Sequence, residues 1–351
     1  MPNGNAAIGG LAGRRVYGAG KQVDNMHRIR GFVVSTLFAS ACMVCAGTSS
    51  VQLANTPYIN GLSENSSGVY RIPAMAKSTN GVIVAVSDCR NNSSEDLPNS
   101  IDIAEVWSGD NGVKWSTPRV GIDVANDGDV RKLRDIGDPC MLYDPVGNKF
   151  WLMAITGGGL ASSHDSSGNS RSDVVLYTRG TGENDAWQEW TGGPEGNRRS
   201  VKQMILDSLA EVDPNATNDE DRICGILQGP GHGIVQRQMV FALDGETVLM
   251  PKDALVFPMQ YFSTKRSENS SSWAAYSWAF AVYSTDGGAT WKSTKLAPTQ
   301  KAQESCVMEI DDGSWVMMAK CQSGGERYFF RTTFCYSFIK IKFSKGCRYF
   351  S

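Results

Sequence analysis

The stretch that decides the fold is "YSTDGGATWKS", Tyr283 to Ser293. Its Asp beside two glycines could be a catalytic acid, a calcium ligand or the centre of a tight turn. A second stretch, "WSGDNGVKW" (Trp107 to Trp115), fits the same Ser-x-Asp-x-Gly-x-x-Trp pattern and also follows an apolar run. In such a turn the Asp accepts hydrogen bonds from nearby backbone amides and the Gly adopts a positive φ. The repetition favours a structural turn, made by Ser108, Asp110, Gly112 and Trp115 in one copy and Ser284, Asp286, Gly288 and Trp291 in the other.

The rest of the chain predicts an all-β fold. Short apolar runs rich in Val, Ile, Trp and Tyr alternate with Gly, Asn, Asp and Ser turns from about Val69, which is the pattern of strands. One helix is predicted, over Arg198 to Asp213. Because a turn repeated at a fixed place in successive sheets is typical of a β-propeller, we expect that fold. The strand-like runs are "GVIVAVSD", "IDIAEVWS", "KFWLMAIT", "DVVLYTRG", "ETVLMP", "ALVFPMQYF", "WAFAVYST", "SCVMEID" and "SWVMMAKC".

The N-terminal region predicts entry into the secretory pathway. Residues 1–25 are Gly- and Ala-rich without a period, and we expect them to be disordered. Residues 26–47 carry a basic start and the uncharged run 31–46, typical of a signal peptide or a signal-anchor. A buried core helix is the other interpretation. The predicted location is extracellular, at the cell surface or lysosomal, with membrane association through residues 31–46.

Charge and cysteine content exclude some partners and sites. The chain has 34 basic and 36 acidic residues, so nothing indicates binding to nucleic acid. Apart from Cys42 and Cys45 in the predicted signal, the seven remaining cysteines show no Cys-x-x-Cys spacing, so we expect no zinc site and no dense disulfide framework, although one or two bridges fit. No metal and no cofactor are expected. Asn-x-Ser/Thr sequons, which agree with a secreted glycoprotein, occur at Asn65, Asn91, Asn92, Asn215 and Asn269.

The repeated turns and an upstream "YRIP" (Tyr70 to Pro73) resemble the sialidase family, whose turns of this kind are called Asp boxes. The family consists of six-bladed propellers that release terminal sialic acids. The resemblance covers about Ser66 to Arg331. Further segments that are similar to the family and follow its order are "VAVSDCRNNSSEDLPNSIDI" (Val84 to Ile103), "GDPCMLYD" (Gly137 to Asp144), "GPGHGI" (Gly229 to Ile234), "LVFPMQY" (Leu255 to Tyr261) and "QESCVMEIDDGSW" (Gln303 to Trp315).

The resemblance implies that arginines bind the carboxylate of the sugar, since a guanidinium group binds a carboxylate through two hydrogen bonds. Arg71 stands in the apolar "VYRIPAM" and must find an anion there. A structural salt bridge to a core carboxylate is the alternative. Arg90 matches a second pocket arginine of the family, although an arginine at a strand end is usually solvated. Both are predicted substrate-binding residues.

Two aspartates take roles by the same resemblance. Asp96, in the loop "NNSSEDLP", matches the general acid that protonates the glycosidic oxygen as the bond breaks. Without the family pattern it would be a solvated turn residue. Asp138, before Pro139, matches a pocket aspartate on the N-acetyl side of the sugar, with turn capping as the alternative.

Glu304 matches the glutamate that takes the proton of the family's tyrosine nucleophile. Sialidases use a tyrosine where most glycosidases use a second carboxylate, which spares the anionic substrate a repulsive neighbour. A tyrosine with a pKa around 10 needs such a partner. Asp96 and Glu304 are therefore the predicted catalytic residues. No tyrosine of this sequence is assigned as nucleophile, because Tyr336 and Tyr349 stand in a different context from the family's.

Two departures from the family pattern bear on activity. Lys320 stands where the family has an arginine, and a lysine keeps the charge but loses the bidentate fork. After Thr333 the sequence reads "FCYSFIKIKFSKGCRYFS", which has no turn-forming residues at regular intervals and no hydrophobic periodicity. We therefore expect a partial propeller of four to five blades at residues 66–333, truncated relative to the family, and an unrelated tail at residues 334–351.

The sequence as a whole predicts an exo-α-sialidase-like hydrolase that acts on sialylated glycans of glycoproteins, glycolipids such as gangliosides, or oligosaccharides. The alternative is a sialic-acid-binding, lectin-like propeller that has lost catalysis. Loss of the nucleophile favours the lectin, and retention of Asp96 and Glu304 favours the enzyme.

Overall fold

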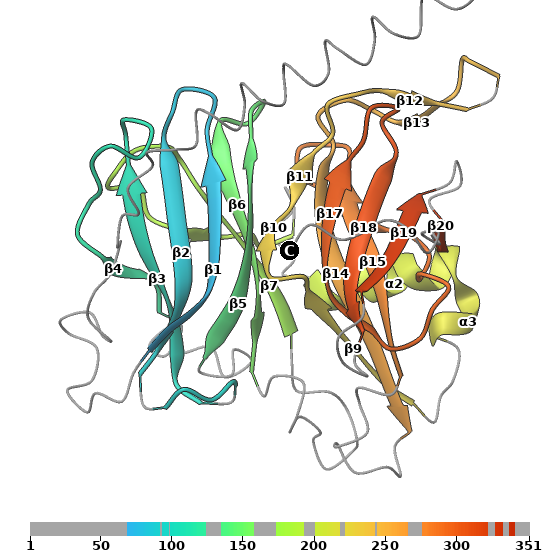
Figure 1. The fold of residues 1–351 in the computed structure, drawn as a ribbon, viewed down its shortest axis with the longest axis horizontal. Helices are drawn as coiled ribbons and strands as arrows, with labels where there is room; N and C mark the ends of the chain where they lie inside the picture. The colour runs from blue at the N-terminus through green and yellow to red at the C-terminus, as the bar shows by residue number, and fades with distance from the viewer. Residues whose placement is uncertain are drawn as a thin grey trace, which may run out of the picture. The chain divides into compact units, whose positions relative to one another are not determined.

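All of the apolar runs predicted as strands are strands in the computed structural model (Figure 1). The structure describes residues 69–91, 93–97, 99–123, 135–157, 173–192, 201–217, 222–242, 244–265, 276–321, 327–332 and 337–340, all within the unit Leu53–Ser351. The segments predicted to be disordered (1–25) and to be a signal (26–47) lie outside the described residues. None of the described helices is long and apolar enough to cross a membrane.

The strands form four main antiparallel sheets in chain order, so the prediction of an all-β, propeller-type fold with four to five blades is confirmed with four sheets in the described part. The first contains β1 (Val69–Lys77), β2 (Ile83–Arg90), β3 (Ile101–Ser108) and β4 (Arg119–Ile122). The second contains β5 (Ile136–Asp144), β6 (Lys149–Thr156), β7 (Asp173–Arg179) and β8 (Gln188–Glu189).

The third sheet contains β14 (Leu255–Lys265), β15 (Ser277–Ser284) and β16 (Lys292–Ser293), with β9 (Arg222–Gln228) and β11 (Ile234–Val235) along the other edge of β14. The fourth contains β17 (Ala302–Glu309), β18 (Trp315–Cys321), β19 (Arg327–Thr332) and β20 (Phe338–Lys340). The short strand β10 (Gly231–His232) runs parallel to β5 and so ties the second sheet to the segment before the third. A separate hairpin pairs β12 (Val240–Phe241) with β13 (Val248–Met250).

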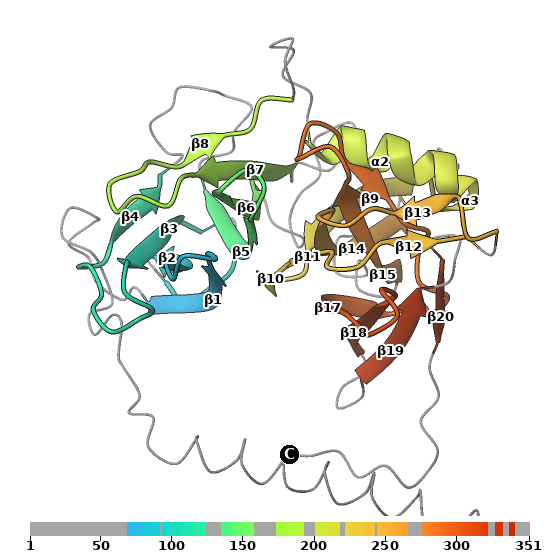
Figure 2. The same cartoon turned by 90° about the horizontal axis from the view of Figure 1, so that it is seen from above.

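Successive sheets pack face to face, with an apolar cluster between each neighbouring pair. Figure 2 shows β1, β10, β11 and β17 towards the middle of the described strands, with β4, β8 and β20 on the outside. One apolar cluster fills the space between the first and second sheets, a second lies between the second and third, and a third lies between the third and fourth. Helix α2 (Val201–Val212), followed by α3 (Pro214–Thr217), packs on β7 and β16 and agrees with the single predicted helix.

The two repeated motifs form the same turn at the same place, between the third and fourth strands of their sheets. In the first copy, Asp110 Oδ1 accepts the amide of Lys114 at 2.8 Å and Gly112 has φ 87°. In the second copy, Asp286 Oδ1 accepts the amide of Thr290 at 2.9 Å. Each serine hydroxyl donates to its Asp, at 2.9 Å and 2.7 Å respectively. In both copies the Asp carboxylate therefore binds groups of its own turn, as expected for a structural turn.

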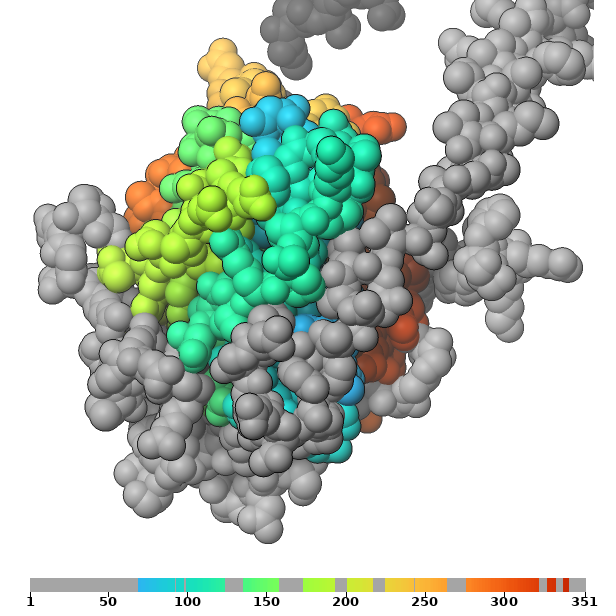
Figure 3. Space-filling view, turned by 90° about the vertical axis from the view of Figure 1, so that its left-hand side faces the viewer, coloured from blue at the N-terminus to red at the C-terminus, as the bar shows by residue number. Residues whose placement is uncertain are grey.

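A buried ion cluster joins the first two sheets on their outer side. Glu105, on β3, is almost fully buried and accepts from Arg119 Nε at 2.6 Å, from Arg179 Nη1 at 2.7 Å and from Trp187 Nε1 at 2.8 Å. Figure 3 shows the teal residues that include β4 beside the yellow-green residues around β8 on this surface. Because Arg179 and Trp187 belong to the second sheet region, Glu105 holds the two sheets together.

Part of the segment predicted to be an unrelated tail belongs to the fourth sheet. Phe338–Lys340 form β20 and pair with β19, with Phe338 opposite Thr332. Phe338 is 4% exposed and packs in the third apolar cluster. These residues therefore supply the outermost strand of that sheet, and residues 334–336 and 341–351 of the tail lie outside the described residues.

Candidate functional site

The predicted site residues gather at one end of the strands. Arg71 and Asp138 lie near the starts of β1 and β5, and Arg90 ends β2. Glu304 lies near the start of β17, opposite the end of β18 that carries Lys320. Because neighbouring antiparallel strands place the start of one beside the end of the next, these side chains share one edge of the sheets.

Arg71, Arg90 and Asp96 form one charged group. Asp96 Oδ1 lies 2.7 Å from Arg90 Nη1 and 3.7 Å from Arg71 Nη1. Both arginines also donate to the carbonyl oxygen of Ser94, at 2.9 Å from Arg71 and 2.7 Å from Arg90. Asp96 is 79% exposed and Arg71 46%, whereas Arg90 is 1% exposed. The two guanidinium groups thus point at a single carboxylate that solvent can reach.

Asp88 completes this group, and sequence reasoning did not single it out. It lies two residues before Arg90 on β2, and its carboxylate accepts from Arg90 Nε at 3.2 Å and from Nη2 at 2.9 Å. Asp88 is fully buried, so burial raises its pKa to about 6 against the lowering effect of Arg90. The sequence did contain a signal for this contact. Asp88 stands two residues before Arg90 at the end of a predicted strand, and residues so spaced lie on the same face.

Asp138 joins the group through its backbone and its charge. Its amide donates to Asp88 Oδ1 at 2.8 Å, and its φ of 54° is left-handed. Burial first, and then the charges of Asp88 and Asp96, raise the pKa of Asp138 to about 7. Near neutral pH this carboxyl can therefore be protonated and donate a hydrogen bond.

Glu304 and Lys320 form a pair of their own. Lys320 Nζ lies 3.1 Å from Oε1 and 3.0 Å from Oε2 of Glu304, and both side chains are about half exposed. Glu304 is near enough to Asp138 for its charge to contribute to the raised pKa of that carboxyl. The Glu304–Lys320 pair therefore lies close to Asp138 and, through it, to the charged group of Arg71, Arg90 and Asp96.

Two buried glutamines lie between the group that contains Asp138 and the pair formed by Glu304 and Lys320. Sequence reasoning did not single them out. Gln228, at the end of β9, donates through Nε2 to the carbonyl oxygen of Asp138. Gln260, on β14 next to the residue that pairs with Gln228, accepts the amide of Glu304 at 3.2 Å. Both side chains are almost fully buried, and each has one amide atom, Gln228 Oε1 and Gln260 Nε2, that finds no hydrogen-bond partner among the described residues. The two glutamines thus hold backbone atoms of Asp138 and Glu304.

Close packing explains the glycine that follows Gln228. A Cβ at Gly229 would lie 1.9 Å from the carbonyl oxygen of Ser305 on β17, so no other residue fits without moving the backbone. The approach brings β9 against the strand that carries Glu304. The "GPGHGI" segment is therefore a packing element of the site.

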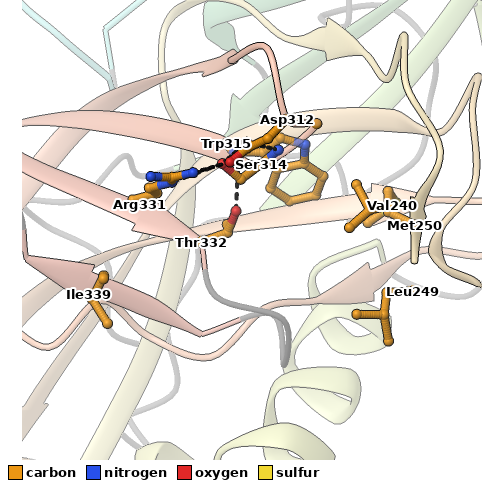
Figure 4. A pocket seen from close by; sticks show the side chains of 10 residues that line it. Val240, Leu249, Met250, Asp312, Ser314, Trp315, Arg331, Thr332 and Ile339 are labelled. Atoms are coloured by element: carbon orange, nitrogen blue, oxygen red, sulfur yellow. Dashed lines mark hydrogen bonds and ion pairs between the residues drawn. The ribbon is translucent and has the colours of Figure 1, made fainter. Parts of the chain in front are cut away.

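An apolar cavity of 380 Å³ lies elsewhere, beside the β12–β13 hairpin (Figure 4). Val240, Met250 and Trp315 line it, and Arg331 at its rim pairs with Asp312. Asp312 lies in the turn that joins β17 to β18, whereas Glu304 and Lys320 lie at the opposite end of the β17–β18 hairpin. The cavity is therefore separate from the predicted site.

Two predictions about ligands and modification meet the structure at this point. The described residues contain no group of three or more His, Cys, Asp or Glu side chains arranged to hold a metal ion. Asn91 is 7% exposed and its side-chain amide donates to Asp102 at 2.7 Å, so it cannot carry a glycan in the folded chain. The sequon at Asn91 therefore gives no support to a glycoprotein, because its amide belongs to a buried hydrogen bond. Asn215 is exposed, and Asn65, Asn92 and Asn269 lie outside the described residues.

Comparisons with known proteins show which proteins this chain is similar to. The family model described as a BNR repeat-like domain matches residues 72–333. The chain is 26% identical over 275 residues to a sialidase of Bacteroides fragilis and 26% identical over 264 residues to a sialidase of Paraclostridium sordellii. The matches cover 75% and 74% of this chain but 42% and 54% of the relatives, so the chain spans about half the length of the curated relatives it matches.

Solved structures share the fold at lower identity. The Hadza microbial sialidase Hz136 aligns with a TM-score of 0.55 at 21% identity, over 78% of this chain and 46% of that protein. The intramolecular trans-sialidase of Ruminococcus gnavus, solved with oseltamivir carboxylate, aligns with a TM-score of 0.53 at 14% identity, over 85% of this chain and 75% of that protein.

Proposed function

The chain belongs to the sialidase family, and from that premise we propose that it is an exo-α-sialidase that releases terminal sialic acid from glycoproteins, glycolipids or oligosaccharides. The observation that carries the proposal is the pair of arginines, Arg71 and Arg90, that converge on the carboxylate of Asp96. A group that binds one carboxylate in this way is suited to bind that of an anionic sugar.

The substrate carboxylate would replace Asp96 between the two arginines. Asp96 is the most exposed member of the group and lies on a loop, so it is the member that can move away. Once released from the two arginines, its carboxylate can take up a proton from solvent, lie beside the bound sugar and donate that proton to the glycosidic oxygen as the C–O bond breaks. It recovers that proton from the water that completes hydrolysis.

Glu304 would act as the base that takes the proton of a nucleophile. The family uses a tyrosine in that role, and we assign none in this chain. Lys320 contacts both oxygens of Glu304 and so fixes the position of that side chain. Asp138, with a pKa near 7, would donate a hydrogen bond to the sugar in its protonated form.

A second candidate is a lectin-like protein that binds sialic acid without cleaving it. Lys320 favours this candidate, since a lysine without a bidentate fork stands where the family has an arginine and is paired with Glu304. Two arginines suffice to bind a carboxylate, whereas catalysis also needs the nucleophile.

A fluorogenic sialoside assay separates the two. For the enzyme, we expect hydrolysis by the wild-type chain and a loss of at least about 100-fold in kcat for Asp96→Ala. Glu95→Ala, an exposed neighbour on the same loop, is the matched control and should keep wild-type kcat. Hydrolysis that survives Asp96→Ala would refute the role of Asp96.

Calorimetric titration with 3′-sialyllactose tests the lectin. Binding without hydrolysis, lost in Arg71→Ala, would support it. A folded chain that neither binds nor cleaves sialosides would contradict both candidates.

We also propose that the protein enters the secretory pathway. The support is the composition of residues 26–47, a basic start followed by an uncharged run. Expression in a secreting host and sequencing of the mature N-terminus test the proposal. Protein that stays in the cytosol with residues 26–47 intact would overturn it.

A further inference from the structure

Asp88 is a fully buried carboxylate that touches two of the predicted site residues at once. Its Oδ2 accepts from Arg90 Nε at 3.2 Å and Nη2 at 2.9 Å. Its Oδ1 accepts the backbone amide of Asp138 at 2.8 Å. One side chain on β2 therefore binds a residue of its own strand and a residue of the neighbouring sheet.

The bond to Arg90 fixes how that guanidinium group is turned. Asp88 occupies the edge made by Nε and Nη2, and the remaining nitrogen, Nη1, faces Ser94 and Asp96 at 2.7 Å each. An arginine without such a partner can rotate about several side-chain bonds. With Asp88 in place, the free edge of Arg90 points to the position that Arg71 also faces.

The bond to Asp138 supports an unusual backbone conformation. A left-handed φ of 54° costs a residue other than glycine free energy, and such residues persist only where their surroundings hold them. Asp138 lies in an irregularity of β5, where the pairing with β6 shifts between Gly137 and Cys140. Its amide is held by Asp88 and its carbonyl oxygen by Gln228, so buried side chains hold both sides of this residue.

We propose that Asp88 is a positioning residue of the sialoside site, which sets the free edge of Arg90 and the backbone of Asp138 without touching the sugar. The inference rests on the proposed function, since it assigns Arg90 and Asp138 to sialoside binding. Asp88 is fully buried behind both residues, so its effect on a ligand passes through them.

A buried ion pair can also be purely structural, and the first sheet offers a matched control. Glu105, on β3, is likewise buried and pairs with the buried Arg179 at 2.7 Å, but neither belongs to the charged group of Arg71, Arg90 and Asp96. If burial alone matters, Asp88→Asn and Glu105→Gln should act alike. If Asp88 positions the site, they should differ in ligand binding.

The test measures the Kd for 3′-sialyllactose and the melting temperature of the full chain. We expect Asp88→Asn to raise Kd by at least about tenfold, because small displacements of binding groups have large effects. Glu105→Gln should lower the melting temperature and leave Kd unchanged below that temperature. A wild-type Kd in folded Asp88→Asn would overturn the proposal.

A second pair of variants covers the case in which Asp88→Asn does not fold. Arg90→Gln combined with Asp88→Asn buries no unpaired charge, and it is compared with Arg90→Gln alone. Since Asp88 acts largely through Arg90, we expect the two Kd values to agree within about twofold. A further tenfold loss in the double variant would overturn the role of Arg90 in the proposal.

A readout without ligand separates this proposal from the proposed function. Carbon-detected NMR titration follows the pKa of Asp138, which burial and then the charge of Asp88 raise to about 7. We expect Asp88→Asn to lower it. A fall would show that the two carboxyls lie close enough for their charges to interact. If the wild-type chain binds no sialoside and this pKa still falls, the proposed function is wrong and the proximity of Asp88 to Asp138 stands. An unchanged pKa would overturn the link between Asp88 and Asp138.

Discussion

Lys320 Nζ lies 3.0 Å and 3.1 Å from the two carboxylate oxygens of Glu304, across the β17–β18 hairpin. The residue that departs from the family pattern is thus bound to the predicted base. Its positive charge is shared between Glu304 and any anionic ligand. A guanidinium group could bind both through separate edges, whereas an ammonium group offers a single centre of charge.

Lys320→Arg should therefore lower KM, or Kd where no turnover is seen, for 3′-sialyllactose by about 3- to 10-fold. The expected gain comes from a bidentate contact to the sugar carboxylate while another edge keeps Glu304. Lys77→Arg, at the other end of β1, is the matched control and should change neither constant. An unchanged or higher KM in Lys320→Arg would show that Lys320 does not face the ligand.

The contribution of Asp102 to the stability of the chain should fall as pH rises from about 4 to about 6. Burial raises the pKa of Asp102 to about 6 from its usual 3.8, so the native state binds more protons than the unfolded state in this range. Asp102→Asn removes this titration and should raise the free energy of unfolding at pH 7.5 by up to about 2 kcal/mol relative to wild type, with no gain at pH 4.

Urea unfolding at the two pH values checks this prediction. Asp244→Asn serves as a control of opposite sign, since hydrogen bonds from the Thr247 hydroxyl and amide lower the pKa of Asp244. That carboxylate stabilises the fold above about pH 4, so its variant should lose stability at neutral pH. A pH-independent effect of Asp102→Asn would contradict the assignment.

Glu105→Gln should destabilise the chain by about 3 to 5 kcal/mol, because it leaves the buried Arg179 charge without a partner. Asp312→Asn breaks a pair of the same type in which Arg331 is 42% exposed, so it should cost less than about 1 kcal/mol. Urea unfolding measures both. Equal losses would mean that burial of the pair does not decide its contribution.

Asp286→Ala should lower stability by about 1 to 2 kcal/mol and leave sialoside binding unchanged. The variant removes the acceptor for Thr290 N at 2.9 Å and for Ser284 Oγ at 2.7 Å, both at the turn between β15 and β16. Asp311→Ala, an exposed turn residue, is the control. A change in Kd at constant stability would place Asp286 in the binding site after all.

The fold could be predicted in detail because its signals are local. Apolar runs of strand length and the two Ser-x-Asp-x-Gly-x-x-Trp turns depend on neighbours within a few residues, so they can be recognised in the amino-acid sequence. The outer strand Phe338–Lys340 was missed for the same reason. It is short and lies in a basic, aromatic segment without turn signals, and only its pairing with β19 makes it a strand.

The site was predicted unevenly. Arg71, Arg90, Asp96, Asp138, Glu304 and Lys320 came from matches to a family, and the structure brings them to one end of the strands. Their roles stay predictions until activity is measured. Asn91 shows the limit of a local motif: the sequon is present, but the amide is buried against Asp102.

The sequence by itself determined the kind of fold and which residue types could serve an anionic sugar. Those properties depend on periodicity, turn chemistry and charge within short stretches. Only the tertiary structure decided which partners those residues have. Asp88 holds Arg90 and Asp138, Gln228 and Gln260 hold the backbone of Asp138 and Glu304, and Lys320 holds Glu304. Contacts between Asp88 and Asp138 join residues 50 positions apart, and burial shifts the pKa values of both. Such effects arise only when separate sheets exclude water from the same place.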